Sequence, residues 1–220
     1  MKNNRTLLIV IGAVVAVLAL AGIAVLAGGG DDDSAGVLAP DETVAGPSGP
    51  VEENRPVEVD EAPLPQLGAE PDPAIGTALP LIEGQTFDGD PITLGGSTDG
   101  STLLVFLAHW CPHCNDEIPE LIELRNRDGI PADMTVIGVS TGVDNTAPNY
   151  PPSEWLLDMG WPWDAMADDS DSTAFVYSGG SGFPYLVVLD ADGNVLARDS
   201  GTKSAEDLAV WIQDALATTA

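Results

Sequence analysis

The stretch HWCPHCNDEIP, residues 109–119, contains both cysteines and both histidines of the chain. Thiols and imidazoles gathered so closely can serve three kinds of chemistry. Cys111 and Cys114 can form a structural disulfide, bind a metal together with His109 and His113, or work as a redox-active pair. The spacing of these residues and the elements around them discriminate between the three.

A purely structural disulfide is the weakest of these interpretations. Only two residues separate Cys111 from Cys114. Closing so short a loop removes little conformational entropy from the unfolded chain, so the crosslink would stabilise the fold very little. The spacing therefore argues against a disulfide whose role is purely structural.

A metal site has more in its favour, because thiolate and imidazole are ligands for zinc and copper. Zinc sites usually take a second pair of ligands from elsewhere in the fold, and this chain has no further cysteine or histidine. Ligands from consecutive residues at a strand-to-helix junction would also converge poorly on a tetrahedral centre. We predict no metal site and keep a copper- or zinc-binding carrier as an alternative function.

The elements that flank the cysteines favour redox chemistry. The apolar run STLLVFLAHW is typical of a central strand that is buried on both faces. A helix is predicted from Pro112 to about Arg127, with proline in its first position and a kink at Pro119. Cys111 therefore falls where the strand gives way to the helix.

This position suits a nucleophilic cysteine. Unpaired N–H groups and the positive end of the helix dipole favour the thiolate of Cys111, whose sulfur we expect to be exposed. Cys114 lies one helical turn further, points inward and can resolve a mixed disulfide. An imidazolium at His113 would favour the thiolate further and make the pair more oxidising, while a solvent-facing His113 without influence is the alternative.

The chain from Gly76 onwards has the pattern of an α/β domain. Its further predicted elements are a hairpin that turns at Asp88-Gly89, a buried strand in MTVIGVS, a short helix over 152–159, a short strand after WPW, a short helix in DSTAFVYSG, a hairpin formed by YLVVLD and VLARDSG, and an amphipathic helix from Ser204 to Ala217. The strands thus alternate with helices before a closing hairpin and helix.

The run FLAHWCPHC followed by NDEIPEL resembles the active site of the thioredoxin superfamily. Within it, the run resembles the membrane-anchored TlpA/ResA-like thiol–disulfide oxidoreductases, and the resemblance covers about residues 76–217. The resemblance implies a thioredoxin fold, with a central mixed sheet flanked by helices and an N-terminal hairpin. It implies no cofactor.

The resemblance also assigns catalytic roles. Cys111 matches the family's nucleophile and Cys114 its resolving cysteine. Glu117 matches an acidic residue that lies near the buried thiol and helps to move its proton, with an ordinary helix glutamate as the alternative.

Substrate-binding residues follow from the same resemblance. Phe183-Pro184 matches the proline that is cis throughout the superfamily and would leave the backbone of Phe183 free to pair with an extended substrate. An ordinary turn proline is the alternative. Trp110 and Pro112 complete the predicted substrate-binding set.

Two departures from the family pattern bear on mechanism. Val105 stands where the thioredoxin branch has a buried aspartate, so a proton relay would have to use Glu117 or water. The dipeptide Pro112-His113 is the one found in DsbA-like oxidants, whereas many reductive TlpA/ResA-like members differ there. The direction of electron flow is left open by these residues.

The N-terminal third has a different character. Residues 7–27 are uncharged and long enough to span a bilayer, and they follow Lys2 and Arg5. We predict a cytoplasmic segment 1–6, a transmembrane anchor 7–27, a disordered acidic, proline-rich linker 28–75 and an exported domain 76–220. A cleavable signal peptide is the alternative for 7–27. The expected location is a bacterial cell membrane, with the domain on its extracytoplasmic side.

The formal net charge of −28 limits the partners. Nucleic acid and anionic lipid headgroups would be repelled. The charge is explained either by a solvated acidic surface or by a surface that selects basic partners. We predict no nucleic-acid partner.

Together these observations predict an extracytoplasmic enzyme that exchanges disulfides with exported proteins through Cys111 and Cys114. An oxidant would need a membrane oxidase for recycling and a reductant a transmembrane electron donor; cytochrome c maturation is one task that the resemblance implies for the reductant. A peroxidase of the peroxiredoxin type is disfavoured, because Trp110 and Pro112 do not match its P-x-x-x-T-x-x-C setting.

Overall fold

The computed structural model describes residues 53–217. The predicted cytoplasmic segment, the transmembrane anchor and residues 28–52 of the predicted linker lie outside this range. Within residues 53–217, no helix combines the length and apolar character needed to cross a membrane.

The described residues form one seven-stranded sheet in the order β2-β1-β5-β4-β3-β6-β7. Its central strands β3, β4 and β5 run parallel, and the outer pairs are antiparallel. The mixed sheet and its N-terminal hairpin match the prediction. The strands are β1 (Ile82–Thr86), β2 (Pro91–Leu94), β3 (Thr102–Leu107), β4 (Thr135–Ser140), β5 (Ala165–Ala167), β6 (Tyr185–Leu189) and β7 (Val195–Ser200).

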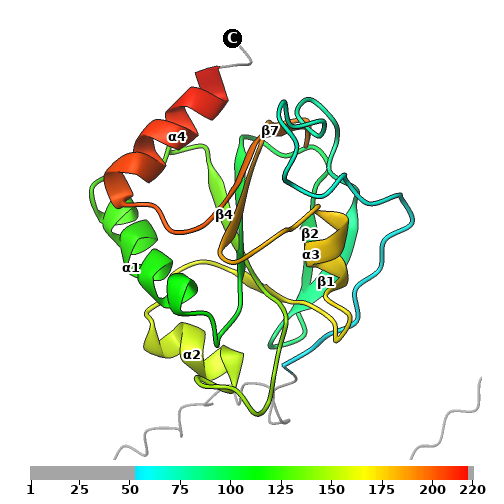
Figure 1. Cartoon of the computed structure of the whole chain (residues 1–220), viewed down its shortest axis with the longest axis vertical. Coiled ribbons are helices and arrows are strands. Elements are labelled where there is room, and N and C mark those ends of the chain that lie inside the picture. The colour runs from blue at the N-terminus through cyan, green and yellow to red at the C-terminus, as the bar shows by residue number, and fades with distance from the viewer. Residues whose placement is uncertain (1–52, 218–220) are drawn as a thin grey trace, which may run out of the picture. The chain divides into compact units, whose positions relative to one another are not determined.

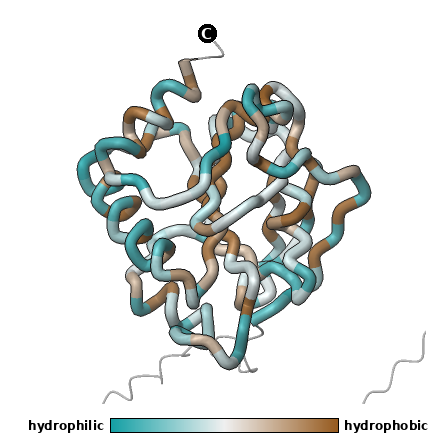
Figure 2. Tube along the Cα trace, in the orientation of Figure 1, coloured by the Kyte–Doolittle hydropathy of each residue, from teal (hydrophilic) through white to brown (hydrophobic). Residues whose placement is uncertain are grey.

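Helices cover both faces of this sheet (Figure 1). They are α1 (Pro112–Asn126), α2 (Pro152–Asp158), α3 (Thr173–Tyr177) and α4 (Ala205–Ala217). In the view of Figure 1, α1, α2 and α4 lie on one side of the sheet and α3 lies on the other. Along α1 and α4, hydrophilic and hydrophobic residues alternate, as expected of helices that each bury one face (Figure 2).

Strand β3 is the centre of the domain. All six of its residues are buried, as its apolar run predicts, and it pairs with β4 on one side and β6 on the other. Successive side chains of β3 point to opposite faces of the sheet and pack into two hydrophobic cores, one on each face. Leu103, Val105 and Leu107 pack beneath α1 and α4, while Leu104 and Phe106 pack on the α3 face.

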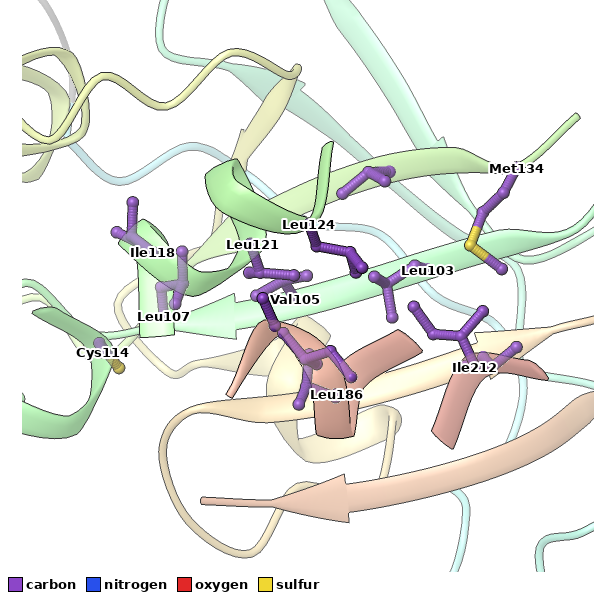
Figure 3. Close-up of a cluster of buried hydrophobic side chains, with 14 of the residues drawn as sticks. Leu103, Val105, Leu107, Cys114, Ile118, Leu121, Leu124, Met134, Leu186 and Ile212 are labelled. Atoms are coloured by element: carbon purple, nitrogen blue, oxygen red, sulfur yellow. The ribbon is translucent and has the colours of Figure 1, made fainter. Parts of the chain in front are cut away.

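The α1 core reaches the redox motif itself (Figure 3). Cys114, Ile118, Leu121 and Leu124 are the apolar buried side chains of α1, and Figure 3 shows Cys114 at one end of this cluster. Helix α4 packs beside α1 and begins after Ser204, whose Oγ accepts a hydrogen bond from the Asp207 amide at 3.1 Å. The predicted serine cap is therefore present.

The predicted disorder is wrong for the end of the linker. Residues 53–75, called here the N-terminal strap, pack against the domain although they contain no regular helix or strand. Leu64 and Ala74 are buried in the α3-side core. The backbone amide of Leu64 donates to the Tyr177 carbonyl at 3.0 Å, and Glu58 forms a two-way antiparallel bridge with Glu83. A few well-placed apolar residues and backbone bonds thus replace the periodic pattern that ordinarily signals folding.

A buried cation ties the strap to the sheet. Arg198 on β7 forms an ion pair with Asp72, and its Nε donates to Asp72 Oδ2 at 2.9 Å. Arg198 Nη1 also donates to the Pro65 carbonyl at 2.9 Å and lies 3.4 Å from the Tyr185 hydroxyl. One side chain therefore joins two points of the strap to β6 and β7.

Candidate active site

The turn between β3 and α1 positions the two cysteines. Cys111 is the N-cap of α1 in an extended conformation, and Pro112 follows in the first helical turn. The Cys111 amide donates to the Ala108 carbonyl at 2.9 Å, and the Asn115 side chain donates to the Cys111 carbonyl at 2.9 Å. These bonds hold Cys111 at the helix N-terminus, as the sequence predicts.

Both cysteines are free thiols, and both are buried. Cys114 is fully buried, as expected, but Cys111 is only 6% exposed, so the prediction of an exposed Cys111 sulfur is wrong. The reason is the loop before β6, which brings the Phe183 carbonyl to 3.7 Å from Cys111 Sγ. The Phe183 loop therefore covers most of the Cys111 side chain.

The Phe183–Pro184 peptide faces the cysteine pair and is cis, as the resemblance implies. The Phe183 ring meets the Trp110 ring edge-to-face with centroids 5.8 Å apart. Trp110 is 38% exposed and donates from its indole nitrogen to the Gly142 carbonyl at 2.7 Å. Trp110, Phe183 and Pro184 are thereby brought together around Cys111.

Cys114 and Glu117 form a buried pair on the inner face of α1. Burial raises the pKa of the Cys114 thiol, and the charges of Cys111 and Glu117 act in the same direction. Burial also raises the pKa of Glu117 to about 7, against the opposing effect of a hydrogen bond from the Lys203 amide. An acid and a thiol that both resist ionisation are suited to passing one proton between them.

Glu117 is incompletely hydrogen-bonded. Its Oε2 accepts the Lys203 amide at 2.7 Å. Its Oε1 is buried and has no hydrogen-bond partner among residues 53–217. Most buried polar atoms are paired, so this oxygen is an unused acceptor on the helix that also carries the buried Cys114.

The two histidines have different surroundings. His113 is exposed, with its carbonyl accepting from Thr202 Oγ1 at 3.3 Å. His109 is fully buried: Nδ1 lies 2.8 Å from the Pro148 carbonyl, and Nε2 accepts the Asp144 amide at 3.2 Å. Both nitrogens of His109 are therefore occupied by the loop after β4, which leaves neither free for a metal.

No cluster of histidine, cysteine and carboxylate side chains suited to a metal ion occurs within the described part of the chain. The alternative of a metal carrier would have to do without His109, because both of its ring nitrogens are in hydrogen bonds. The histidine belongs to the support of the site, because it fixes the loop that carries Gly142.

Sequence reasoning missed two supporting residues. Asn115 links the site to α2, because its Oδ1 accepts from the Trp155 indole at 2.9 Å while its Nδ2 binds the Cys111 carbonyl. Gly142 has φ +60, and a Cβ there would lie 3.7 Å from the Phe183 ring. Asn115 directly follows Cys114 and could have been suspected from that position, whereas the contacts of Gly142 connect distant segments and leave no local signal.

The fold and site define a class of protein. A C-x-x-C pair at the start of a helix that follows the central strand of a mixed sheet, facing a cis-proline, is the arrangement of a thioredoxin-fold thiol–disulfide oxidoreductase. The predicted resemblance is confirmed by comparison with known sequences. The profile of the AhpC/TSA family matches residues 75–198, and the chain belongs to this family.

Relatives and solved structures agree with this assignment. The chain is 31% identical over 132 residues to the thiol:disulfide interchange protein HelX of Rhodobacter capsulatus, covering 59% of this chain and 69% of HelX. It is 32% identical over 108 residues to a DsbE homologue of Paracoccus denitrificans, covering 49% of this chain and 55% of that protein. The chain therefore spans about half the length of the latter relative.

A solved structure of a thiol:disulfide interchange protein from Chlorobium tepidum, described as a thioredoxin family protein, has a similar fold. It is 28% identical, with a TM-score of 0.50, and the match covers 64% of this chain and 97% of that one. The thioredoxin fold predicted from the sequence is thereby confirmed for the described domain.

Proposed function

We propose that this protein is an extracytoplasmic thiol–disulfide oxidoreductase that exchanges disulfides with exported proteins through Cys111 and Cys114. The observation that carries the proposal is the position of Cys111 at the start of α1 against the cis-proline loop, with Cys114 and Glu117 both buried on the same helix. The proposal agrees with the names of the relatives, HelX and the DsbE homologue, as thiol:disulfide interchange proteins.

As a reductant, the enzyme acts in two exchange steps. The thiolate of Cys111 attacks a substrate disulfide, whose S–S bond breaks so that one substrate sulfur leaves as a thiolate and the other is bonded to Cys111. Cys114 then loses its proton and attacks Cys111 Sγ, which releases the second substrate sulfur. Two electrons have passed to the substrate, and the enzyme holds the Cys111–Cys114 disulfide.

Oxidation of a substrate dithiol is the reverse sequence. A substrate thiolate attacks Cys111 Sγ, and Cys114 leaves and takes up a proton. A second substrate thiolate then displaces Cys111 and closes the substrate disulfide. The same atoms serve both directions, so the reduction potential of the pair selects between them.

Glu117 supplies the proton transfer in either direction. A pKa of about 7 leaves its carboxyl partly protonated near neutral pH, so it can accept the proton of Cys114 or return it. The unpartnered Oε1 is the oxygen available for this step. Val105 lies buried in the strand below and offers no alternative base.

Substrate binding is assigned to the rim of the site. The exposed Trp110 and the half-buried Phe183 form an aromatic rim beside Cys111. The backbone next to the cis-Pro184 can pair with an extended substrate segment. Pro112 keeps the start of α1 free of an N–H donor beside the exposed edge of the site.

The cellular setting rests on the sequence. We propose an anchor at residues 7–27, an extracytoplasmic domain and a membrane redox partner that recycles the cysteines. The anchor residues lie outside the described range.

Capture of substrates tests the proposal. The Cys114→Ser variant should accumulate mixed disulfides through Cys111, because the resolving thiol is missing. These adducts should be visible as reducible bands on gels of cells that export the protein. The Cys111→Ser variant is the matched control and should form none; equal adducts on both variants would contradict the assigned nucleophile.

The reduction potential tests the direction of electron flow. The Pro112-His113 dipeptide favours an oxidant, since an imidazolium beside Cys111 stabilises the reduced thiolate form. We expect the potential of the wild type to lie above about −200 mV and that of His113→Ala to fall by about 30 mV. Equilibration with glutathione measures both values. A wild-type potential near about −270 mV, as for thioredoxin, would make the protein a reductant.

A further inference from the structure

A cavity of about 660 Å³, whose lining does not include the cysteines, lies between α2, the turn of the β1–β2 hairpin and the segment before β5. Its volume lies within the ~300–1,000 Å³ that is usual for ligand pockets. Its described lining contains four aromatic side chains and five carboxylates, and no lysine, arginine or histidine. This composition points to a cationic occupant.

The aromatic part of the wall is preformed. The Trp161 and Trp163 rings meet edge-to-face with centroids 4.8 Å apart. Trp161 lies flat against β4 because Gly138 has no side chain: a Cβ there would be 2.8 Å from the Trp161 ring. Phe87 and Tyr150 complete the aromatic lining. Indole faces bind cations by cation–π attraction, most strongly where water is excluded.

Most carboxylates of the acidic wall form no ion pair with the described residues. Asp88, Asp90, Glu154 and Asp164 line the cavity, and within residues 53–217 no ion pair to these four is found. The fifth carboxylate, Glu53, is engaged.

Two side chains near the acidic wall have other roles. Both oxygens of Glu53 accept hydrogen bonds from Ser153, at 2.6 and 2.9 Å, and fix the start of the strap to α2. Arg55 lies against the turn of the hairpin, where its Nη2 donates to the Phe87 carbonyl at 2.6 Å and its guanidinium lies beside Gly89, between Asp88 and Asp90. Arg55 offsets part of the charge of Asp88 and Asp90, whereas the described lining supplies no basic side chain to Glu154 and Asp164, so the wall as a whole can attract a cationic ligand.

The rim of the cavity is apolar and exposed. Leu157 is 77% exposed and Tyr150 is 46% exposed, although both line the cavity. Large exposed apolar side chains beside a hollow are typical of a surface that contacts another protein. A free small cation would leave this rim and most of the volume unfilled.

The cavity is also linked to the cysteine site. The Tyr150 ring packs edge-to-face on His109, with centroids 6.0 Å apart, and His109 precedes Cys111 by two residues. A protein segment held in the cavity would thus lie on the same side of the domain as the redox motif.

We propose that this cavity is an exosite that binds an arginine or lysine side chain within a basic segment of a substrate protein. The proposal rests on the proposed disulfide exchange, and it names the class of substrate: exported proteins with a basic segment near the exchanging cysteines. The carboxylates attract the cation, the tryptophan rings stack on it, and Leu157 and Tyr150 contact the neighbouring residues of the segment. The acidic character of the chain then serves recognition as well as solubility.

Peptide binding to the full-length reduced protein in detergent tests the proposal. The probe is a fluorescein-labelled, end-blocked pentapeptide Gly-Arg-Gly-Arg-Gly, and its matched control carries citrulline, which has nearly the same shape without the charge. Fluorescence anisotropy at physiological salt should show at least fivefold tighter binding of the arginine peptide. Equal binding of the two peptides, or no binding of either, would overturn the proposal.

Two sets of variants locate the binding. Asp88→Asn with Asp90→Asn should weaken arginine-peptide binding at least fivefold, and Trp163→Leu at least threefold. Asp99→Asn with Asp192→Asn removes the same charge from exposed turns away from the cavity and should change binding less than twofold. If this control variant loses as much peptide affinity as the cavity variants, the binding comes from general attraction by the acidic surface and not from the cavity. If free arginine amide binds as tightly as the peptide, the ligand of the cavity is a small organic cation and the proposed protein segment is ruled out.

A separate measurement distinguishes this proposal from the proposed function. Exchange with a small aromatic disulfide requires Cys111 but not the cavity, so wild type and Asp88→Asn/Asp90→Asn should react at the same rate. If the protein binds the peptide but exchanges no disulfide, the proposed oxidoreductase activity is wrong and only the cation-binding site is supported. Exchange without peptide binding would refute the exosite alone.

Discussion

The carboxylates of Glu117, which is buried, and Asp72, which is half-buried, lie on opposite faces of the sheet in different surroundings. Asp72 belongs to the strap and meets the guanidinium of Arg198, whose hydrogen bond holds the pKa of this carboxyl below its ordinary value. Glu117 accepts one backbone amide, and burial raises its pKa to about 7 although the charge of Lys203 acts in the opposite direction without forming an ion pair with it. The first carboxylate is paired with a cation, and the second is not.

The difference separates structure from chemistry. A buried charge that is paired and hydrogen-bonded holds segments together and has no reason to change its protonation near neutral pH. A buried carboxyl with an unpartnered oxygen costs stability once it ionises, and such a cost is typical of a group that must exchange protons. We therefore expect changes at Arg198 and Asp72 to affect stability, and changes at Glu117 to affect both stability and reaction rate.

The largest effect is expected at Arg198. Arg198→Met leaves the half-buried Asp72 without its cation and removes donors from the Pro65 and Ser178 carbonyls, so the free energy of unfolding should fall by about 3 kcal/mol. Urea denaturation measures it. Arg127→Met, which breaks the exposed pair with Glu123, is the control and should cost below about 0.5 kcal/mol. Similar costs for the two variants would remove the distinction between buried and surface pairs.

The next effect is expected at Glu117, and it depends on pH. The folded-state pKa is raised, so the stability present at low pH is lost as pH rises through about 7. The side chain of the Glu117→Gln variant does not titrate. The free energy of unfolding of this variant should therefore exceed that of the wild type by up to about 3 kcal/mol at pH 8, with a smaller difference near pH 5. Denaturation at both pH values checks this.

The same variant should slow the chemistry. Resolution of a mixed disulfide by Cys114 should be roughly 10²-fold slower in Glu117→Gln, because the thiol loses its proton acceptor. Stopped-flow single-turnover reduction measures the rate. Asp116→Asn, one residue earlier on the exposed side of α1, should react like the wild type; unchanged kinetics in Glu117→Gln would leave the carboxyl without a role in proton transfer.

The smallest effect is expected at Asp72, with the opposite dependence on pH. The pKa of Asp72 is lowered by Arg198, so its stabilisation is present above the ordinary pKa and is lost as pH falls through the lowered one. Asp72→Asn should cost about 1–2 kcal/mol at pH 7 and progressively less in acid. Asp60→Asn, on an exposed part of the strap, is the control. Parallel pH slopes for Asp72→Asn and Glu117→Gln would contradict the comparison.

Local sequence signals were sufficient for most of the fold. The apolar run of β3, the proline at the start of α1 and the turn residues of both hairpins each act within a few neighbouring residues. The positions of Cys111 and Cys114 follow from the junction of two such elements. For this reason the sheet, its helices and the inward-pointing Cys114 could be predicted.

Contacts between distant residues could not be predicted in this way. The exposure of Cys111 depends on the Phe183 loop, and the hydrogen bonds of His109 come from residues 144–148. The strap was missed because its composition is polar and proline-rich, whereas its order comes from isolated anchors such as Leu64 and the pairing of Asp72 with Arg198. Neither anchor has a periodic pattern.

The strap also changes where this domain should be said to begin. The family match starts at residue 75, after Leu64, Asp72 and Ala74, although Leu64 and Ala74 fill part of the core. A chain truncated at residue 75 would expose that core to solvent and would leave Arg198 without its counter-ion, Asp72. For protein engineering, a chain that keeps this core and this ion pair should therefore include residues 53–75, and relatives should be compared over this longer span.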